Sequence, residues 1–319
     1  MNAASSGDVH ISRADQLTPD EVRAVLTLTE SAGRADGAAP VSEHVLLSLR
    51  QPRSEATTHL IAREPGGPPV GYAHLDISPG PRGFSAELVV HPQNRRRGLG
   101  RSLVEAVLAA AGGASPATGT TLGVWAHGDH PSAAAIALDL GFRRDRVLWQ
   151  LRRPLTGDLV GPELPTGVTL RPFAPGADDA AWLALNARAF ASHPEQGRWT
   201  IADLHARMAE PWFDPSGFLL ATADDGRLLG FHWTKVHPPA TDHGRSMGEV
   251  YVLGVDPDTH GLGLGKALTL AGLTHLRDRG LPRVMLYVDE SNAPAMRLYQ
   301  RLGFGSWSAH VTWRRPVTG

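Results

Sequence analysis

The sequence predicts an α+β protein with two similar domains in tandem, each a mixed, mostly antiparallel sheet flanked by helices. First, 319 residues are too many for one small domain and enough for two cores. Second, one phrase occurs twice, at 88–100 and 253–265, with Gly98 matching Gly263. Third, each half repeats the order β-α-α-β-β-β-α-β-α-β, which differs from the alternating βαβ order of a parallel sheet.

The second half shows this order most clearly. Short apolar or β-branched runs predict strands, and longer runs with apolar residues three or four positions apart predict helices. In chain order we expect a strand at 168–173, helices at 178–190 and 201–210, strands at 218–222 and 228–236, a strand at 249–255, a helix at 263–279, a strand at 284–288, a helix at 293–302 and a final strand pair.

The limits of the two domains follow from the repeat. A segment rich in proline and glycine and poor in periodicity separates the copies, which is typical of a linker. We therefore expect a first domain at 1–153, a linker at 154–166 and a second domain at 167–319.

The composition excludes several classes of protein. With 31 Lys+Arg against 32 Asp+Glu, no general basic surface for nucleic acid or anionic membrane is expected. The absence of cysteine excludes disulfides, thiolate nucleophiles and Cys-ligated metals, and no His/Asp spacing suits a metal. The polar N-terminus is not that of a signal peptide, so none is expected, and no apolar run is near the roughly 18 residues that span a bilayer. The sequence therefore predicts a cytoplasmic protein without a metal.

The repeated phrase predicts an anion site. In the first copy a valine-rich strand runs into Arg95-Arg96-Arg97, then Gly98 and Gly100, then a helix. Glycines at such a turn let several N–H groups of a helix N-terminus converge on one anion, and a pyrophosphate fits. One Gly-x-Gly turn could equally be structural, but its recurrence in the same context favours the anion site.

These features together resemble the GNAT (acyl-CoA N-acyltransferase) superfamily: Arg-x-x-Gly-x-Gly between strand and helix, then a strand, an Asn-x-x-Ala helix and Leu-Gly-Phe. The resemblance covers nearly the whole chain and implies acetyl-CoA as co-substrate, with one site in each domain. The glycine loop would bind its pyrophosphate, and the preceding strand would pair with its pantetheine arm. The residues with these implied roles are Leu88, Val89, Val90, Arg96, Arg97, Gly98, Leu99, Gly100 and Arg101 in the first copy, and Leu253, Gly254, Val255, His260, Gly261, Leu262, Gly263, Leu264, Gly265, Lys266, Asn292, Ala293, Pro294, Ala295, Met296 and Arg297 in the second.

One departure concerns the second loop. Where the superfamily usually has Gln-Arg-Arg, this chain has His260-Gly261-Leu262. Phosphate binding there is expected to depend on backbone donors and Lys266, and to be weaker.

Longer sequence segments resemble one family within this superfamily. Segments 39–43, 193–197, 230–238, 248–257 and 297–304 are similar to tandem GNAT enzymes that acetylate the cysteinyl amine of cysteinyl-glucosaminyl-inositol, the precursor of mycothiol. The resemblance implies that small-molecule substrate for this chain, and it implies contacts from Glu43, Glu195, Lys235, Glu249 and Tyr287. Carboxylates suit a substrate with an ammonium group and many hydroxyls, because they accept several hydrogen bonds.

The two copies differ in the groups that the chemistry needs. Amide formation from a thioester needs an acceptor for the amine proton and a donor for the departing thiolate. Glu249 and Tyr299 supply them in the second copy, whereas alignment puts Phe84 and Ala137 at these positions in the first. Glu87 is three residues out of register, on the opposite face of its strand unless a bulge intervenes. We therefore expect the second copy to react and the first to bind acetyl-CoA without turnover.

Other interpretations stay open. Without the resemblance, a lone Glu would be a paired surface group and a lone Tyr a packed ring. The acceptor could instead be an aminoglycoside, a polyamine or a protein N-terminus, or the chain could be a non-catalytic acetyl-CoA sensor, for which a damaged second loop would argue. Tryptophans 182, 199, 212 and 233 could stack on a sugar, but core packing is favoured for most of them. Two joined copies can replace a dimer, so a monomer is expected.

Overall fold

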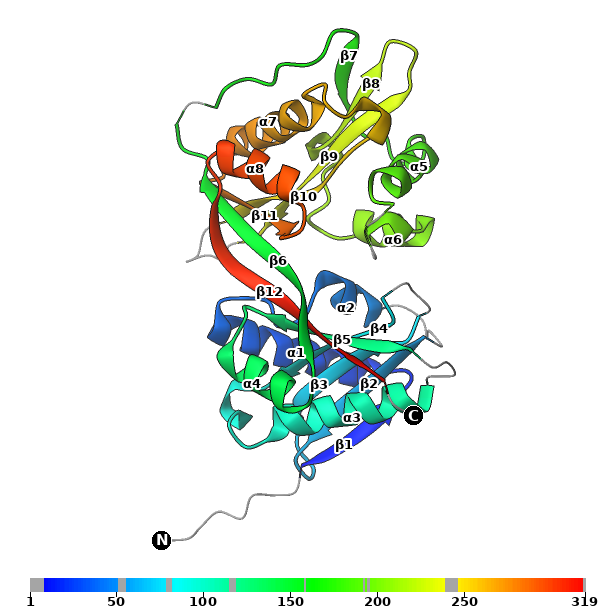
Figure 1. The fold of residues 1–319 in the computed structure, drawn as a ribbon, viewed down its shortest axis with the longest axis vertical. Helices are drawn as coiled ribbons and strands as arrows, with labels where there is room; N and C mark the ends of the chain where they lie inside the picture. Colours follow the sequence, from blue (N-terminus) through cyan, green and yellow to red (C-terminus); the bar gives the residue numbers. More distant parts are fainter. Residues whose placement is uncertain are drawn as a thin grey trace. The chain divides into compact units, whose positions relative to one another are not determined.

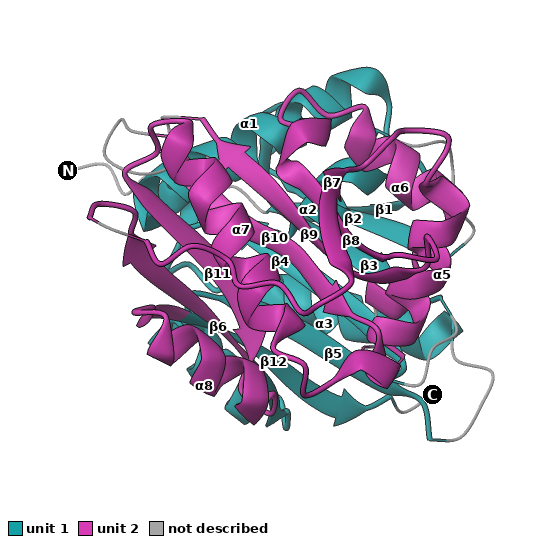
Figure 2. Ribbon diagram, turned by 90° about the horizontal axis from the view of Figure 1, so that it is seen from above, with its two compact units in different colours: residues 1–147, 309–319 teal, residues 148–308 magenta. Residues whose placement is uncertain are grey.

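The structure is a computed structural model that describes residues 9–50, 56–78, 82–114, 119–157, 159–191, 193, 196–238 and 246–317. It divides into two compact units (Figure 2). The first comprises residues 1–147 and 309–319, and the second comprises residues 148–308.

The first unit is an α+β layer structure around a sheet with strand order β1-β2-β3-β4-β5-β12. Neighbouring strands are antiparallel except β4 and β5, which are parallel. Its elements are β1 (His10–Ala14), α1 (Pro19–Asp36), α2 (Glu43–Ser48), β2 (Thr57–Arg63), β3 (Pro69–Asp76), β4 (Phe84–Val90), η1 (Pro92–Asn94), α3 (Leu99–Ala114), β5 (Thr121–His127), α4 (Pro131–Asp139) and the C-terminal part of β12 (Gly305–Pro316).

The second unit repeats this plan with strand order β7-β8-β9-β10-β11-β6, and its parallel pair is β10 and β11. Helices α5 and α6 lie on one side of this sheet and α7 and α8 on the other (Figure 1). Its elements are the C-terminal part of β6 (Arg143–Pro154), β7 (Val168–Pro172), α5 (Asp179–Ala189), η2 (Gln196–Arg198), α6 (Ile201–Met208), η3 (Pro215–Gly217), β8 (Phe218–Ala223), β9 (Leu228–His237), β10 (Met247–Val255), η5 (Pro257–Thr259), α7 (Leu264–Asp278), β11 (Arg283–Asp289) and α8 (Ala293–Arg301).

The element order and the fold class expected from the sequence are confirmed. One detail was wrong: the expected final strand pair is a single strand, β12, which runs unbroken from Gly305 to Pro316. Its sequence carries no turn signal between those ends, so the chain continues as one extended segment.

The C-terminal parts of the two long strands, β6 and β12, each belong to the sheet of the other repeat. The C-terminal part of β6 precedes the linker, yet it pairs with β11, with Leu151 opposite Leu286. The C-terminal part of β12 follows α8, yet it pairs with β5, with Val311 opposite Ala126. Each sheet is therefore completed by the last strand of the other repeat.

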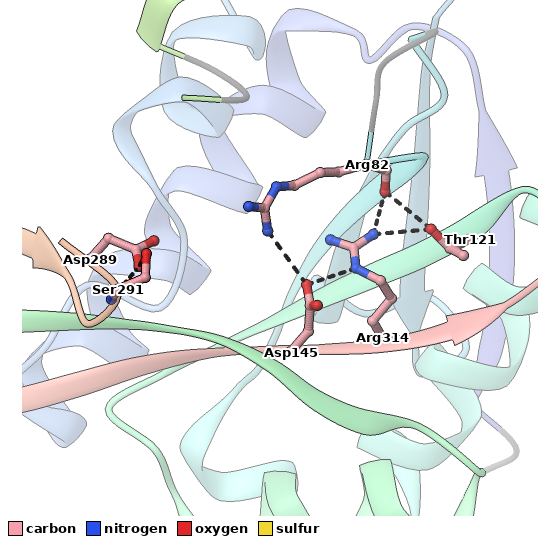
Figure 3. Close-up of polar contacts among 6 residues, drawn as sticks. All are labelled: Arg82, Thr121, Asp145, Asp289, Ser291 and Arg314. Atoms are coloured by element: carbon pink, nitrogen blue, oxygen red, sulfur yellow. Dashed lines mark hydrogen bonds and ion pairs between the residues drawn. The ribbon is translucent and has the colours of Figure 1, made fainter. Parts of the chain in front are cut away.

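Polar contacts fix β12 to the first unit (Figure 3). Arg314 Nε donates to Asp145 Oδ2 at 2.7 Å, and its Nη1 donates to Thr121 Oγ1 at 3.2 Å and to the carbonyl oxygen of Arg82. Arg82 in turn lies 3.8 Å from the Asp145 carboxylate. The end of the chain is thus held by charge-assisted hydrogen bonds as well as by the strand ladder.

This exchange places the unit boundaries inside β6 and β12, between 147 and 148 and between 308 and 309. The sequence limits of 1–153, 154–166 and 167–319 follow the repeat instead, and they stay a prediction.

The core of the second unit has two halves, one on each face of its sheet. On the α5 and α6 face, buried aromatic rings pack together, with Trp182 and Trp233 fully buried and Trp199 and Trp212 partly buried beside them. On the α7 and α8 face the core is aliphatic and includes Tyr299. The four tryptophans therefore pack in or against the core, as favoured.

Candidate active site

Both parallel strand pairs separate before the glycine loop. In the second unit β10 pairs with β11 only over residues 248–250, and 253–255 pairs with β9 alone among the strands that the structure describes. In the first unit β4 pairs with β5 over 84–87, and 88–90 pairs with β3 alone within the same described ranges. Each open edge offers main-chain N–H and C=O groups to an extended ligand, at the residues predicted to contact pantetheine.

A β-bulge distinguishes the two units. The register of β10 against β9 shifts between Val250 and Val252, so that Tyr251 is the extra residue. Tyr251 and Val252 both pack on the aromatic core, whereas Val250 belongs to the aliphatic core on the other face. Because the bulge adds one residue, the three-residue offset between Glu249 and Glu87 leaves both carboxylates on corresponding faces of their sheets.

The two glycine loops have the same backbone conformation. The positive-φ residues are Arg96 (64°) and Gly98 (84°) in the first loop, and Gly261 (88°) and Gly263 (78°) in the second. No heavy atom outside the adjacent residues would lie within 4 Å of a Cβ at Gly98, Gly261 or Gly263, so the backbone angle rather than space favours glycine there. At Gly261 the second loop therefore has a glycine at a position of positive φ, where the first loop holds an arginine in a strained backbone conformation.

The helix that follows the second loop, α7, starts with N–H groups that can bind an anion. Gly263 is the N-cap of α7, and no side chain caps this end. The first N–H groups of a helix lack intrahelical acceptors and carry the positive end of the dipole. The loop and α7 together therefore suit a phosphate group.

The charges around the two loops are arranged differently. In the first, Arg95 forms a two-pronged ion pair with Asp36 (2.6 and 2.8 Å), and Arg101 pairs with Glu105 and Asp139. Arg96 is exposed beside them. In the second loop an exposed cation is Lys266, which corresponds to Arg101 in the repeat. Positive charge therefore remains available at both loops.

Glu249 lies buried on β10, with 6% of its surface exposed. Its Oε2 accepts a hydrogen bond from His237 Nε2 at 2.6 Å. Its cross-strand neighbour is Lys235, whose ammonium lies 4.4 Å from the Trp212 ring centroid and 4.9 Å from that of Tyr251. A carboxylate, an imidazole and an ammonium thus share one face of the strand pair.

Tyr287 completes this group from β11. Its hydroxyl accepts a hydrogen bond from Gln150 Nε2 at 2.7 Å, and Gln150 Oε1 accepts one from Arg152 Nε at 2.9 Å. Tyr287 is 38% exposed, but desolvation of its hydroxyl, followed by the negative charge of Glu249, raises the pKa of Tyr287 to about 12. The phenol is therefore neutral near pH 7 and can donate a hydrogen bond.

Tyr299 lies on α8, in the aliphatic core on the other face of the sheet from the group around Glu249. Its ring packs 5.6 Å from Phe304, and burial raises the pKa of its hydroxyl to about 12, so it is also a neutral donor. The turn before α8 is shaped by Asp289, whose Oδ1 accepts from Ser291 N and Oγ at 2.9 and 2.6 Å (Figure 3). Asn292 caps α8 by accepting from Ala295 N at 3.2 Å. The predicted cofactor residues 292–297 thus form the first turn of this helix.

Glu87 in the first unit is already fully engaged. It accepts from Ser42 N at 2.5 Å, Ser42 Oγ at 2.7 Å and His127 Nε2 at 3.0 Å. Burial alone would raise its pKa, but these hydrogen bonds outweigh it and lower the pKa to about 2. Such a carboxylate is a poor base near neutrality.

The remaining predicted residues are placed as follows. Phe84 and Ala137 are buried and bring no titratable group to the first unit. Glu43 is the first residue of α2, next to the capping Ser42. Glu195 lies outside the described residues.

Sequence reasoning did not assign a role to His237 or Gln150. His237 follows Lys235 by two positions on one strand, so alternation alone could have placed both on one face. Gln150 had no such signal, because its contact with Tyr287 depends on the strand exchange.

The duplicated sheet with separated strands and paired glycine loops defines an acetyltransferase of the GNAT class. The model of the acetyltransferase (GNAT) domain matches residues 55–144, and that of the acetyltransferase (GNAT) family matches 181–304. Two solved structures share the fold over nearly the whole chain. A tandem GNAT protein from the clavulanic acid biosynthesis pathway has a TM-score of 0.73 at 22% identity, covering 98% of this chain and 99% of its own. A GCN5-related N-acetyltransferase from Sphaerobacter thermophilus has a TM-score of 0.69 at 25% identity, covering 97% and 96%.

The curated relatives show to which family of GNAT acetyltransferases the chain belongs. The mycothiol acetyltransferase of Salinispora arenicola is 60% identical over 99% of this chain and 100% of its own, and that of Streptomyces coelicolor is 52% identical over 94% and 93%. The chain belongs to the mycothiol acetyltransferase family. None of the described helices is both long and apolar enough to cross a bilayer.

Proposed function

We propose that this chain transfers an acetyl group from acetyl-CoA to the cysteinyl amine of cysteinyl-glucosaminyl-inositol, giving mycothiol and CoA. The observation that carries the proposal is the buried Glu249, on the strand whose open edge leads to the second glycine loop. The family to which the chain belongs supplies the acceptor.

The cofactor-binding role rests on two groups of residues in the second unit. The main-chain groups of Leu253, Gly254 and Val255 can pair with an extended amide-containing arm, and the loop at 260–266 can hold a pyrophosphate. The corresponding groups in the first unit are 88–90 and 96–101. Acetyl-CoA carries both an extended pantetheine arm and a pyrophosphate, so one binding site per unit fits the geometry.

Glu249 would accept the proton that the amine loses as its nitrogen attacks the thioester carbonyl. An α-amine has a pKa of roughly 7.7 to 8.0, so only modest basicity is needed. As the new C–N bond forms and the C–S bond breaks, Tyr299 would donate a proton to the departing thiolate and regain it from solvent. Burial raises the pKa of this phenol to about 12, which keeps it protonated near pH 7, as a proton donor must be.

Lys235 and Tyr287 are proposed to contact the acceptor, because they surround Glu249 on the same face of the sheet. The resemblance that implies these two residues also implies Glu43 and Glu195, which stay predictions.

The first unit is proposed to bind acetyl-CoA without turnover. This is supported by the low pKa of Glu87, whose oxygens already accept hydrogen bonds, and by Ala137 at the position of Tyr299. No group of three or more His, Cys, Asp or Glu side chains that could hold a metal occurs among the described residues. A cytoplasmic monomer without a metal stays the prediction.

The test is CoA release from acetyl-CoA with cysteinyl-glucosaminyl-inositol, compared with free cysteine and free glucosamine. We expect saturable release with the full acceptor alone. Release only with other amines would reject the acceptor but keep the acetyltransferase, and no release with any amine would favour an acetyl-CoA sensor.

A further inference from the structure

The candidate active site contains a hydrogen bond that the proposed reaction does not yet use. His237 Nε2 lies 2.6 Å from Glu249 Oε2, and both side chains are largely buried, with 19% and 7% of their surface exposed. We propose that His237 is a positioning residue for Glu249, holding one carboxylate oxygen so that the other faces the amine. This inference rests on the proposed function.

The direction of the hydrogen bond follows from the chemistry of the two groups. An ionised carboxylate only accepts, so Nε2 must carry the hydrogen, either in the Nε2–H tautomer of neutral histidine or in the imidazolium. His237 therefore holds Oε2 with a directional hydrogen bond and fixes the rotamer of Glu249.

The strand ladder explains why this contact is stable. Glu249 pairs with Lys235, and His237 pairs with Met247, so the imidazole is diagonal to the carboxylate on one face of an antiparallel pair. Diagonal neighbours on a sheet are within reach of long side chains. Backbone geometry thus holds the donor in place independently of any ligand.

Two other polar groups face this pair. Lys235 lies on β9 beside Glu249, with its ammonium against the rings of Trp212 and Tyr251. Tyr287 on β11 is influenced by the charge of Glu249. A cation and a phenol thus lie near Glu249, and His237 supplies a directional hydrogen bond to its Oε2.

In the first unit the corresponding carboxylate, Glu87, accepts hydrogen bonds from more donors. There Glu87 is bound by a histidine, His127, and also by the N–H and hydroxyl of Ser42, which makes it structural. At Glu249 the hydrogen bond found among the described residues engages Oε2, so Oε1 can take the amine proton, directly or through a water molecule.

The experiment compares His237→Phe with His237→Gln. The phenylalanine removes the donor, whereas a glutamine amide can place an N–H near the position of Nε2. His205→Gln is the matched control, because His205 forms a similar 2.7 Å pair with Asp179 on α6 and α5. The kcat, the KM of each substrate and the pH dependence of kcat are measured after wild-type turnover of cysteinyl-glucosaminyl-inositol has been established.

A positioned proton acceptor contributes roughly 10²–10⁴-fold to a rate, and we expect His237→Phe to lose at least about tenfold of kcat. The KM for acetyl-CoA should stay unchanged. The acid limb of the kcat profile should move to higher pH, because the proton acceptor has lost the hydrogen-bond donor that stabilises its charged form. His237→Gln should restore part of both effects, and His205→Gln should match the wild type.

Two results would overturn the inference. One is a wild-type kcat and pH profile in His237→Phe. The other is a lower kcat with an unshifted acid limb and no rescue by glutamine, which would indicate packing alone. If the wild type did not acetylate this acceptor, the proposed function would fail first, and the same pH comparison with any amine that is acetylated would still test His237.

Discussion

The exchanged strands predict that a mutation before the linker will destabilise the unit that follows it. Leu151 lies on β6, in sequence part of the first repeat, but it is 1% exposed within the aliphatic core of the second unit. Truncating a buried leucine to alanine lowers the free energy of unfolding by about 2–5 kcal/mol. A loss of about 3 kcal/mol makes the equilibrium constant for local unfolding roughly a hundredfold larger. Leu151→Ala should therefore accelerate exchange in β11 and α8.

The reciprocal variant is Val311→Ala on β12, which is fully buried but belongs to the first unit. Losing two methyl groups at about 0.8 kcal/mol each, plus a cavity, gives about 2 kcal/mol and roughly thirtyfold faster opening. This variant should loosen β5 and β4. Leu138→Ala is the control, because that side chain is 61% exposed.

The assay is amide hydrogen exchange resolved by peptide, at a denaturant concentration where opening limits protection. The reasoning would be refuted if Leu151→Ala accelerated exchange in β2 and β3 and left β11 and α8 as in the wild type. The same holds if Val311→Ala acted on β10 and α7 and not on β5.

Three further outcomes are expected. Glu249→Gln and Tyr299→Phe should each lower kcat by about a hundredfold with the Kd of acetyl-CoA unchanged, measured by steady-state kinetics and calorimetry, and wild-type turnover in the double variant would reject both roles. Gly98→Trp, at a φ of 84°, should lower thermal stability or acetyl-CoA stoichiometry more than kcat, and complete loss of turnover in a folded variant would contradict this. Burial lowers the pKa of His74 to about 4 and, with His127, that of His310 to about 3, so the unfolded state binds protons first and the free energy of unfolding should fall as pH drops from 6.5 towards 4. Urea denaturation with no change over that interval would contradict this account.

Much of the fold could be predicted because its signals are local. The strand at 249–255 and the helix after Gly263 are readable from β-branched runs and from glycine in a turn, and the repeat supplies each of them twice. The conformation at Gly261 also agrees with its sequence, because glycine adopts positive φ without strain.

The exchange of β6 and β12 could not be predicted, because alternation along a strand specifies which face is buried and not which strand lies beside it. The partner of Leu151 depends on contacts far along the chain, and so does the hydrogen bond from Gln150 to Tyr287.

Residue spacing alone does not show whether Glu249 and Glu87 lie on corresponding faces of their sheets. Counting residues put Glu87 on the wrong face relative to Glu249, but the extra residue at Tyr251 restores the correspondence. The two carboxylates therefore differ in the number of hydrogen-bond donors around them. This number depends on side-chain packing and cannot be read from the sequence.

The C-terminal part of β12 also constrains how the protein is made. Residues 309–316 are synthesised long after β5, and until they emerge β5 has an unpaired edge where His310 to Pro316 will later pair. An unpaired strand edge is a template for aggregation. The first unit must therefore stay incomplete until β12 has emerged, so a chain truncated before β12 should be damaged in the unit that was synthesised first.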